Sequence, residues 1–210
     1  MDKQDYAISG LIGFFAGIFA IPVLMNLGHR DPFLLLALPW VLAIASAIGA
    51  IIAGYLGKKM PFFNQFAKFI VVGVLNTTID FGILNTISLI TGVTGGVVVG
   101  GVNLPGVALA LVNAYFWNKY WVFKHRDDKG ALGDLPRFLL VSAIGITINS
   151  GVVILATSYP VMSLDAKTWL NIAKAIASVS SLAWNFLGYK FIVFRTAAPK
   201  EPEHTPIAPL

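Results

Sequence analysis

Long runs of apolar residues, separated by short polar breaks, are the main pattern along the chain. A membrane-spanning helix needs roughly 20 apolar residues to cross a hydrocarbon core about 30 Å thick. Every run of this length is a candidate transmembrane helix, and the sequence predicts six of them. They cover residues 7–27, 33–56, 68–91, 97–119, 136–159 and 169–193.

The breaks between the runs contain charged residues, proline or glycine, which favour turns or water over a continuous helix. They lie at residues 29–32, 57–61, 91–96, 124–134 and 160–168. The third break has turn residues but no charge. The fourth helix could therefore begin instead at residues 103–106, with Pro105 in its first turn.

The first run is expected to be a retained helix rather than a signal peptide. Its leading region carries Asp2 and Asp5 beside Lys3, so it is not positively charged, and no small-residue cleavage site follows promptly. Within this run, Gly13 and Gly17 form a Gly-x-x-x-Gly pattern, which predicts close packing against a neighbouring helix.

Composition agrees with a membrane protein. Hydrophobic residues make up 57% of the 210 residues and charged residues only 12%, whereas soluble domains carry about 25% charge. The mean hydropathy is +0.77. Because the chain has no cysteine and its three histidines fall in predicted loops or tails, we expect no disulfide, no metal site and no cofactor.

The basic residues predict the orientation in the membrane. In a six-span arrangement, 12 of the 15 lysines and arginines fall on one side, which the positive-inside rule assigns to the cytoplasm together with both termini. The net charge of +5 is then mainly a topology signal, and nucleic-acid binding is not expected.

Two segments of the chain resemble each other. Residues 68–82 align with residues 137–151, and residues 119–124 align with residues 190–195, at nearly constant offsets. The pattern predicts two repeat units, 66–124 and 136–195, each a helical hairpin that starts and ends in the cytoplasm. Repeats of this parallel kind occur in transporters.

The expected fold class is therefore an all-α polytopic membrane protein, in which an added N-terminal hairpin precedes the two repeated hairpins. The expected divisions are an N-terminal hairpin at 1–60, a four-helix membrane domain at 61–196 and a disordered cytoplasmic tail at 197–210, where prolines and charges alternate.

Four short motifs in the repeats carry a resemblance to a known family. They lie at residues 68–80, 115–123, 137–149 and 185–194, and combine a basic residue plus Phe, a polar Asn-Thr stretch and a Lys-x-x-Val-Phe ending. Together they resemble the GtrA-like family of small four-span membrane proteins over about residues 66–195. The chain departs from the pattern at Ala114, where the second unit has Asn185.

The resemblance implies translocation of a polyprenyl-phosphate-linked monosaccharide across the bacterial inner membrane, for glycosylation of cell-surface polysaccharide. A flippase of this kind needs no covalent chemistry, so the chain is not expected to be an enzyme. Its expected partners are the lipid-linked sugar and the bilayer, and a homodimer could complete the path.

Two charged residues inside the predicted spans are candidates for function, because a charge at the bilayer centre costs at least about 2.5–3.5 kcal/mol. They are Asp80 and Lys174. Asn76 lies one helical turn before Asp80, and Asn149 occupies the position of Asp80 in the second repeat. We expect these four residues to line a cavity between the repeats. Alternatively, Asp80 and Lys174 form a buried ion pair that fixes helix packing.

Basic residues at the cytoplasmic ends of the spans are candidates for binding the lipid phosphate, because interfacial lysine and arginine attract anionic headgroups by roughly 1 kcal/mol each. The repeat pairs Lys68 with Arg137 and Lys119 with Lys190. Asn185 joins the substrate-binding candidates through its family motif. Plain anchoring at the membrane interface is the alternative role for the basic residues.

Two other functions also fit the sequence. The chain could be a membrane scaffold that recruits a polyprenyl-phosphate glycosyltransferase through its basic rim. It could also be a small proton-coupled exporter of cations, for which a membrane carboxylate such as Asp80 is the required feature.

Overall fold

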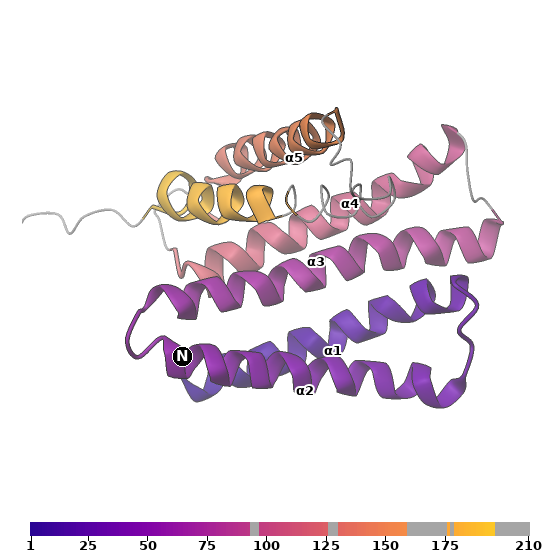
Figure 1. Ribbon diagram of the computed structural model, residues 1–210, viewed down its shortest axis with the longest axis horizontal. Helices are drawn as coiled ribbons and strands as arrows, with labels where there is room; N and C mark the ends of the chain where they lie inside the picture. The colour runs from indigo at the N-terminus through magenta and orange to yellow at the C-terminus, as the bar shows by residue number, and fades with distance from the viewer. Residues whose placement is uncertain (93–96, 126–129, 159–175, 177–178, 196–210) are drawn as a thin grey trace, which may run out of the picture. The chain divides into compact units, whose positions relative to one another are not determined.

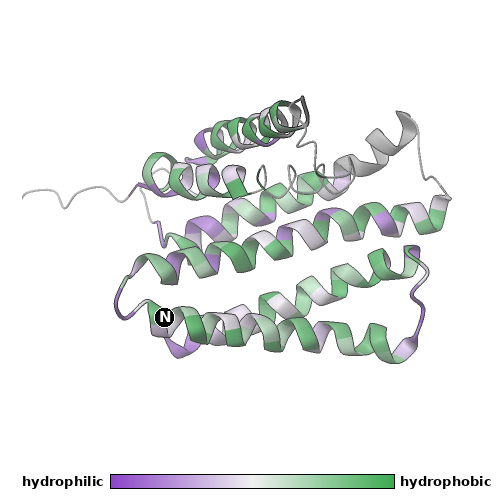
Figure 2. Cartoon of the chain, viewed as in Figure 1, coloured by the Kyte–Doolittle hydropathy of each residue, from purple (hydrophilic) through white to green (hydrophobic). Residues whose placement is uncertain are grey.

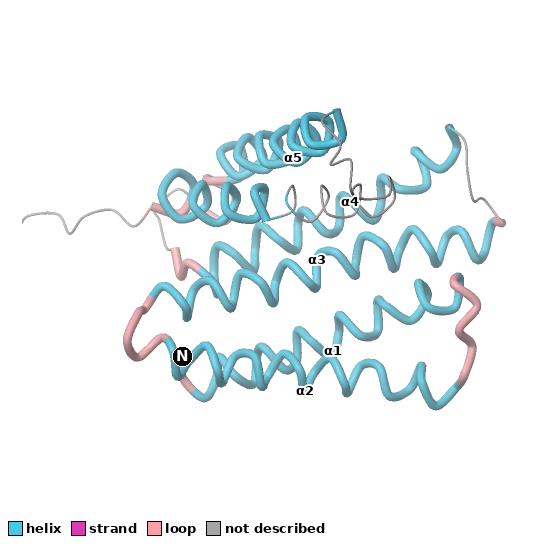
Figure 3. The backbone as a smooth tube through the Cα atoms, viewed as in Figure 1, coloured by secondary structure: helices cyan, strands magenta, loops and turns pink. Residues whose placement is uncertain are grey.

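The computed structural model describes the chain except for residues 93–96, 126–129, 159–175, 177–178 and 196–210. Within the described residues all regular structure is helical (Figures 1 and 3). The elements are α1 (Lys3–Asn26), α2 (Pro32–Leu56), α3 (Phe62–Thr91), α4 (Val97–Trp117), the π-helix η1 (Asn118–Val122), α5 (Leu135–Ser158) and the π-helix η2 (Tyr189–Val193). Residues 179–188 are helical and lead directly into η2.

Three of the described helices, α1, α2 and α3, are long and apolar enough to cross a membrane. Apolar residues cover most of their length, and hydrophilic residues gather in the loops that join them (Figure 2). The helices confirm the all-α class, while the count of six spans stays a prediction. The sixth run lies partly outside the described residues, and the tail at 197–210 lies wholly outside them.

One helix start agrees with the sequence prediction and another differs from it. The fourth helix begins at Val97, where the predicted fourth span begins, and continues through Pro105, so the alternative start at 103–106 is wrong. Membrane helices tolerate an internal proline, because neighbouring groups satisfy the freed backbone carbonyl. The third helix begins at Phe62, earlier than the apolar run, and this places Lys68 inside α3 rather than at its edge.

The chain divides into two compact units, Met1–Lys124 and His125–Leu210. In the first unit, α1 packs against α2 and α3, and α3 packs against α4 (Figure 1). The two glycines of the Gly-x-x-x-Gly pattern make the contact with α2: Gly13 lies against the backbone of Leu42, and Gly17 lies against Pro39. The close packing predicted for this pattern is confirmed.

The second unit packs α5 against the helix at 179–188 and η2. Trp184 Nε1 donates a hydrogen bond to the Val141 carbonyl at 3.0 Å. The Ser142 and Tyr189 hydroxyls lie 2.7 Å apart, and the rings of Phe138 and Tyr189 stack with centroids 4.7 Å apart. Polar and aromatic contacts therefore hold this helix pair in one register.

The packing of α1 on α2 predicts a specific cross-link. A Cβ atom placed on Gly10 would lie 3.7 Å from the Ala47 Cβ, within the range of about 3.5–4.5 Å that a disulfide requires. Since the chain has no native cysteine, oxidised Gly10→Cys/Ala47→Cys protein should hold its fragments together after cleavage at Arg30. The matched control is Gly10→Cys/Gly49→Cys, because Gly49 has no neighbour within 4 Å. Equal cross-linking of both pairs would contradict this register.

Candidate functional site

A groove between α3 and α4 contains three polar residues of the first unit. It has a volume of about 250 Å³ and is lined by Asn76, Thr77, Asp80, Val107, Ala110, Leu111 and Ala114. Asn76 and Asp80 are one helical turn apart, so both side chains reach the same face of α3. The structure therefore brings together two of the four residues that the sequence assigned to a cavity.

The two polar side chains of the groove differ in their hydrogen bonding. Asn76 Oδ1 accepts a hydrogen bond from Asn113 Nδ2 at 2.6 Å, which fixes the orientation of the Asn76 amide. Asp80 Oδ1 is buried and accepts no hydrogen bond within the described part of the chain. A buried acceptor without a donor costs about 1–3 kcal/mol. Asp80, which lines the groove, therefore carries a carboxylate oxygen whose hydrogen-bonding capacity is not used by the described residues.

A glycine in α4 makes room for Asp80. A Cβ atom on Gly106 would lie 2.7 Å from the Asp80 carbonyl oxygen and 3.0 Å from Asp80 Oδ1. Any side chain at this position would push the two helices apart. Gly106 therefore sets the width of the groove at the level of the carboxylate.

Gly106→Ala is expected to lower the free energy of unfolding by about 1–3 kcal/mol, because the added methyl group overpacks the contact between α3 and α4. Thermal unfolding in detergent measures the loss. The matched control is Gly49→Ala on α2, where the new methyl group meets no atom within 4 Å. Equal free energies of unfolding for the two variants would contradict the close approach of Gly106 to Asp80.

Lys119 lies in the π-helix η1. The backbone hydrogen bond from Phe123 N to Asn118 O, 2.9 Å long, spans five residues and defines this wide turn. Lys119 is 2% exposed, and its Nζ lies 3.5 Å from the Tyr115 hydroxyl and 5.7 Å from the centre of that ring. The structure therefore places this ammonium in the interior of the unit, against an aromatic ring, rather than on an open rim.

Lys190 has the same local setting in η2. Phe194 N donates to Tyr189 O at 2.8 Å across five residues, and Lys190 Nζ lies 5.8 Å from the centre of the Phe186 ring, four residues earlier. The side chain is half-buried. Local π-helical turns occur frequently at functional sites. Phosphate binding by the two lysines stays a prediction.

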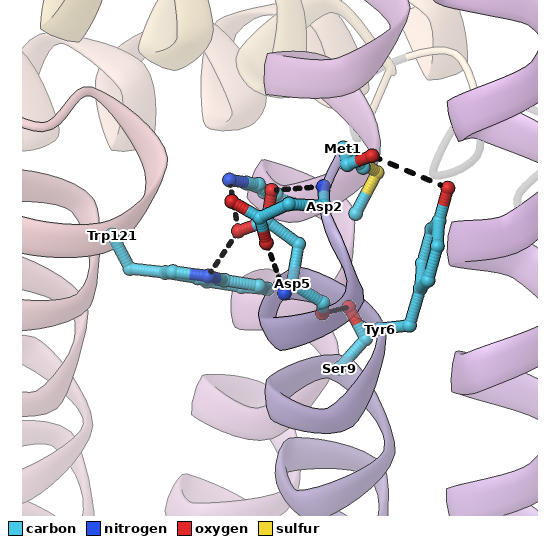
Figure 4. Close-up of polar contacts among 7 residues, drawn as sticks. Met1, Asp2, Asp5, Tyr6, Ser9 and Trp121 are labelled. Atoms are coloured by element: carbon cyan, nitrogen blue, oxygen red, sulfur yellow. Dashed lines mark hydrogen bonds and ion pairs between the residues drawn. The ribbon is translucent and has the colours of Figure 1, made fainter.

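A buried ion pair lies at the end of the first unit where α1 and α3 begin. Lys68 Nζ donates to Asp5 Oδ1 at 2.5 Å, and Trp121 Nε1 donates to the same oxygen at 3.1 Å (Figure 4). Asp5 is held in place by the first turn of α1, where Asp2 Oδ1 accepts from the Asp5 amide at 2.8 Å. The predicted rim residue Lys68 is therefore paired within the protein.

The other predicted site residues are spread over the second unit. Asn149 lies on α5 and is half-buried, and Arg137 is exposed at the start of the same helix. Asn185 faces Gly145 of α5, and its Oδ1 is buried without a hydrogen-bond donor in the described residues. Lys174 lies outside the described residues, so its pairing with Asp80 stays a prediction.

Sequence reasoning missed three residues of the first unit. Asp5 was considered only as a charge before the first span, and neither Trp121 nor Asn113 was among the predicted site residues. The signal for Asp5 was available, because it lies three residues after another aspartate at the start of an apolar helix, a pattern typical of a capping pair. Its pairing with Lys68 depends on tertiary structure.

Residues 68–201 match the family model described as GtrA/DPMS, transmembrane domain. The match covers more than half of the chain and begins at Lys68, close to the start of the resemblance expected from the motifs. Comparisons with curated proteins and with solved structures gave no match.

Proposed function

Because the chain belongs to the GtrA/DPMS transmembrane-domain family, we propose that this multi-pass membrane protein translocates a polyprenyl-phosphate-linked monosaccharide from the cytoplasmic to the outer leaflet of a bacterial inner membrane. One observation carries the proposal beyond the family. Asp80, inside the long apolar helix α3, lines the groove together with Asn76, and one of its carboxylate oxygens is buried without a hydrogen-bond donor in the described residues.

The groove suits the sugar part of such a lipid. A monosaccharide carries several hydroxyl groups, each of which can donate to a carboxylate and accept from an amide. Asp80 would accept from one hydroxyl and Asn76 Nδ2 would donate to another, while Asn113 keeps the Asn76 amide in one orientation. The polyprenyl tail would stay in the lipid, so only the polar headgroup needs a path past α3.

A local structure that occurs twice in the chain supports the proposal that the transporter consists of two related hairpins. The π-helices η1 and η2 occupy aligned positions, and each carries a lysine with an aromatic residue four positions earlier. In the proposed mechanism, the basic residues capture the phosphate, and rocking of one repeat hairpin against the other gives alternating access. No bond of the substrate is made or broken.

Transport by the purified protein tests the proposal against its rivals. Proteoliposomes that contain only this chain should move a labelled polyprenyl-phosphate monosaccharide between leaflets without a glycosyltransferase. Movement that begins only when a glycosyltransferase is added would favour the scaffold. Proton-driven movement of an organic cation in place of the lipid would favour the exporter.

A further inference from the structure

The cluster of Asp5, Lys68 and Trp121 has the composition of an anion-binding site. An ammonium and an indole N–H both donate to one carboxylate oxygen, and Lys68 Nζ lies 5.2 Å from the centre of the Trp121 ring. The Lys68 side chain is 5% exposed and the Asp5 side chain 7%. Charge-assisted hydrogen bonds of this kind are the strong ones, and they suit phosphate oxygens as well as carboxylates.

The charges of the cluster balance only while the first turn of α1 is in place. The exposed Lys124 adds positive potential at Asp5, and Asp2 adds negative potential at Lys68. Two aspartates from the start of α1 thus face two lysines. Without that turn, two positive charges and the Trp121 N–H group would remain, which is the complement of a phosphate group.

Displacement of Asp5 requires only the first turn of α1 to open, where Tyr6 contacts Gly54 of α2. Asp2 and Asp5 hydrogen-bond each other at 2.8 and 3.2 Å, so they move as one unit. Further along, Gly13 and Gly17 bring α1 into direct contact with α2. Terminal turns of a helix open at a lower free energy than packed central turns.

We infer that Lys68 and Trp121 form a phosphate-binding site, and that Asp5 occupies it as a built-in competitor which the phosphate of a polyprenyl lipid displaces. The identity of this ligand rests on the proposed function. Lys68 lies about 9 Å along α3 from its first residue, a depth at which a lipid headgroup can reach it. Asp5 precedes the family-matched region 68–201, so the N-terminal hairpin adds this competitor to the family domain.

Amide hydrogen exchange of the full-length wild-type protein tests the displacement directly. A short-chain polyprenyl phosphate should raise the exchange rate of residues 3–9, because Asp5 leaves Lys68 and the first turn frays. The corresponding polyprenol, which lacks the phosphate, should leave the rate unchanged. A similar rise with inorganic phosphate would support the anion site and show that free phosphate suffices. Unchanged or slower exchange with every probe would overturn the inference.

Removal of the competitor gives a second, independent measurement. In Asp5→Ala protein, polyprenyl phosphate should bind about tenfold or more tightly than in the wild type, because the Asp5 carboxylate no longer occupies the site. Ligand-induced thermal shifts report this affinity, and Asp5→Asn, which preserves volume, replaces Asp5→Ala if the alanine variant does not fold. Asp5→Ala/Lys68→Gln should lose the gain. An unchanged or weaker affinity on removal of Asp5 would contradict the site.

The two proposals fail separately. Displacement of Asp5 by phosphate without transport in proteoliposomes would leave the anion site standing and remove the flippase. If the wild-type protein transports the lipid but its first turn never responds to polyprenyl phosphate, the flippase stands and the displacement of Asp5 is wrong.

Discussion

Replacing Asp80 with asparagine is expected to lower the initial rate of lipid-linked sugar transport by about 10–100-fold. The carboxylate offers the groove a charged acceptor, and hydrogen bonds to charged groups contribute about 1.5–3 kcal/mol, where each 1.4 kcal/mol is a tenfold change in rate. Asparagine keeps the size of the side chain, so the variant should insert and unfold as the wild type does. The measurement is the rate of leaflet exchange in proteoliposomes with equal amounts of inserted protein.

Asp31→Asn is the matched control for this variant. Asp31 is exposed and caps α2 by accepting from the Leu34 amide at 3.0 Å, and asparagine caps a helix equally well. The same chemical change outside the groove should leave transport unchanged. Full transport by Asp80→Asn protein would show that the charge has no part in the mechanism.

Replacing Lys68 with methionine is expected to lower the free energy of unfolding by about 3–5 kcal/mol. The change leaves the Asp5 carboxylate buried without its cation, and breaking one side of a buried pair is costly for this reason. The double variant Asp5→Asn/Lys68→Met removes both charges and should recover most of the loss. Thermal or denaturant unfolding of the purified protein in detergent gives the values for both variants.

Asp2→Asn controls for the general effect of removing an acid from the first turn of α1. Asp2 is exposed, and asparagine can still cap the helix by accepting from the Asp5 amide. We expect this variant to change stability little. If Lys68→Met and the double variant are equally unstable, the stabilisation comes from the contacts of the lysine chain rather than from the ion pair.

Much of the fold could be predicted from the sequence, because it depends on properties that follow the chain. Apolar runs of sufficient length predict α1, α2 and α3, and spaced glycines predict the contact through Gly13 and Gly17. The start of α4 was harder to place. Residues 91–96 carry turn residues without charge, and a proline inside a helix looks the same in sequence as a proline at a helix start.

The candidate site could be predicted only in part. Asn76 and Asp80 share a helix face by spacing alone, so their meeting in one groove needed no tertiary information. The partners from other helices could be identified only from the tertiary structure, because Asn113 and Gly106 reach α3 only when α4 packs alongside it. Asp5 and Lys68 are far apart in the chain, and depth in the membrane does not say which charges meet.

The rim lysines show a second limit of reasoning from position. Lys119 and Lys190 end predicted spans, where a basic side chain is expected at the interface. The π-helical turns instead bring each ammonium against the ring of Tyr115 or Phe186. A π-turn is a local departure from regular helix geometry that propensity and hydropathy do not report.

Leaflet exchange by the purified chain is the measurement that tests the central claim most directly. A labelled polyprenyl-phosphate monosaccharide is placed in one leaflet of protein-free liposomes and of proteoliposomes, and its appearance in the other leaflet is followed over time. The account predicts rapid exchange with wild-type protein and little more than the protein-free rate with Asp80→Asn protein. Exchange at the protein-free rate with correctly inserted wild-type protein would contradict it.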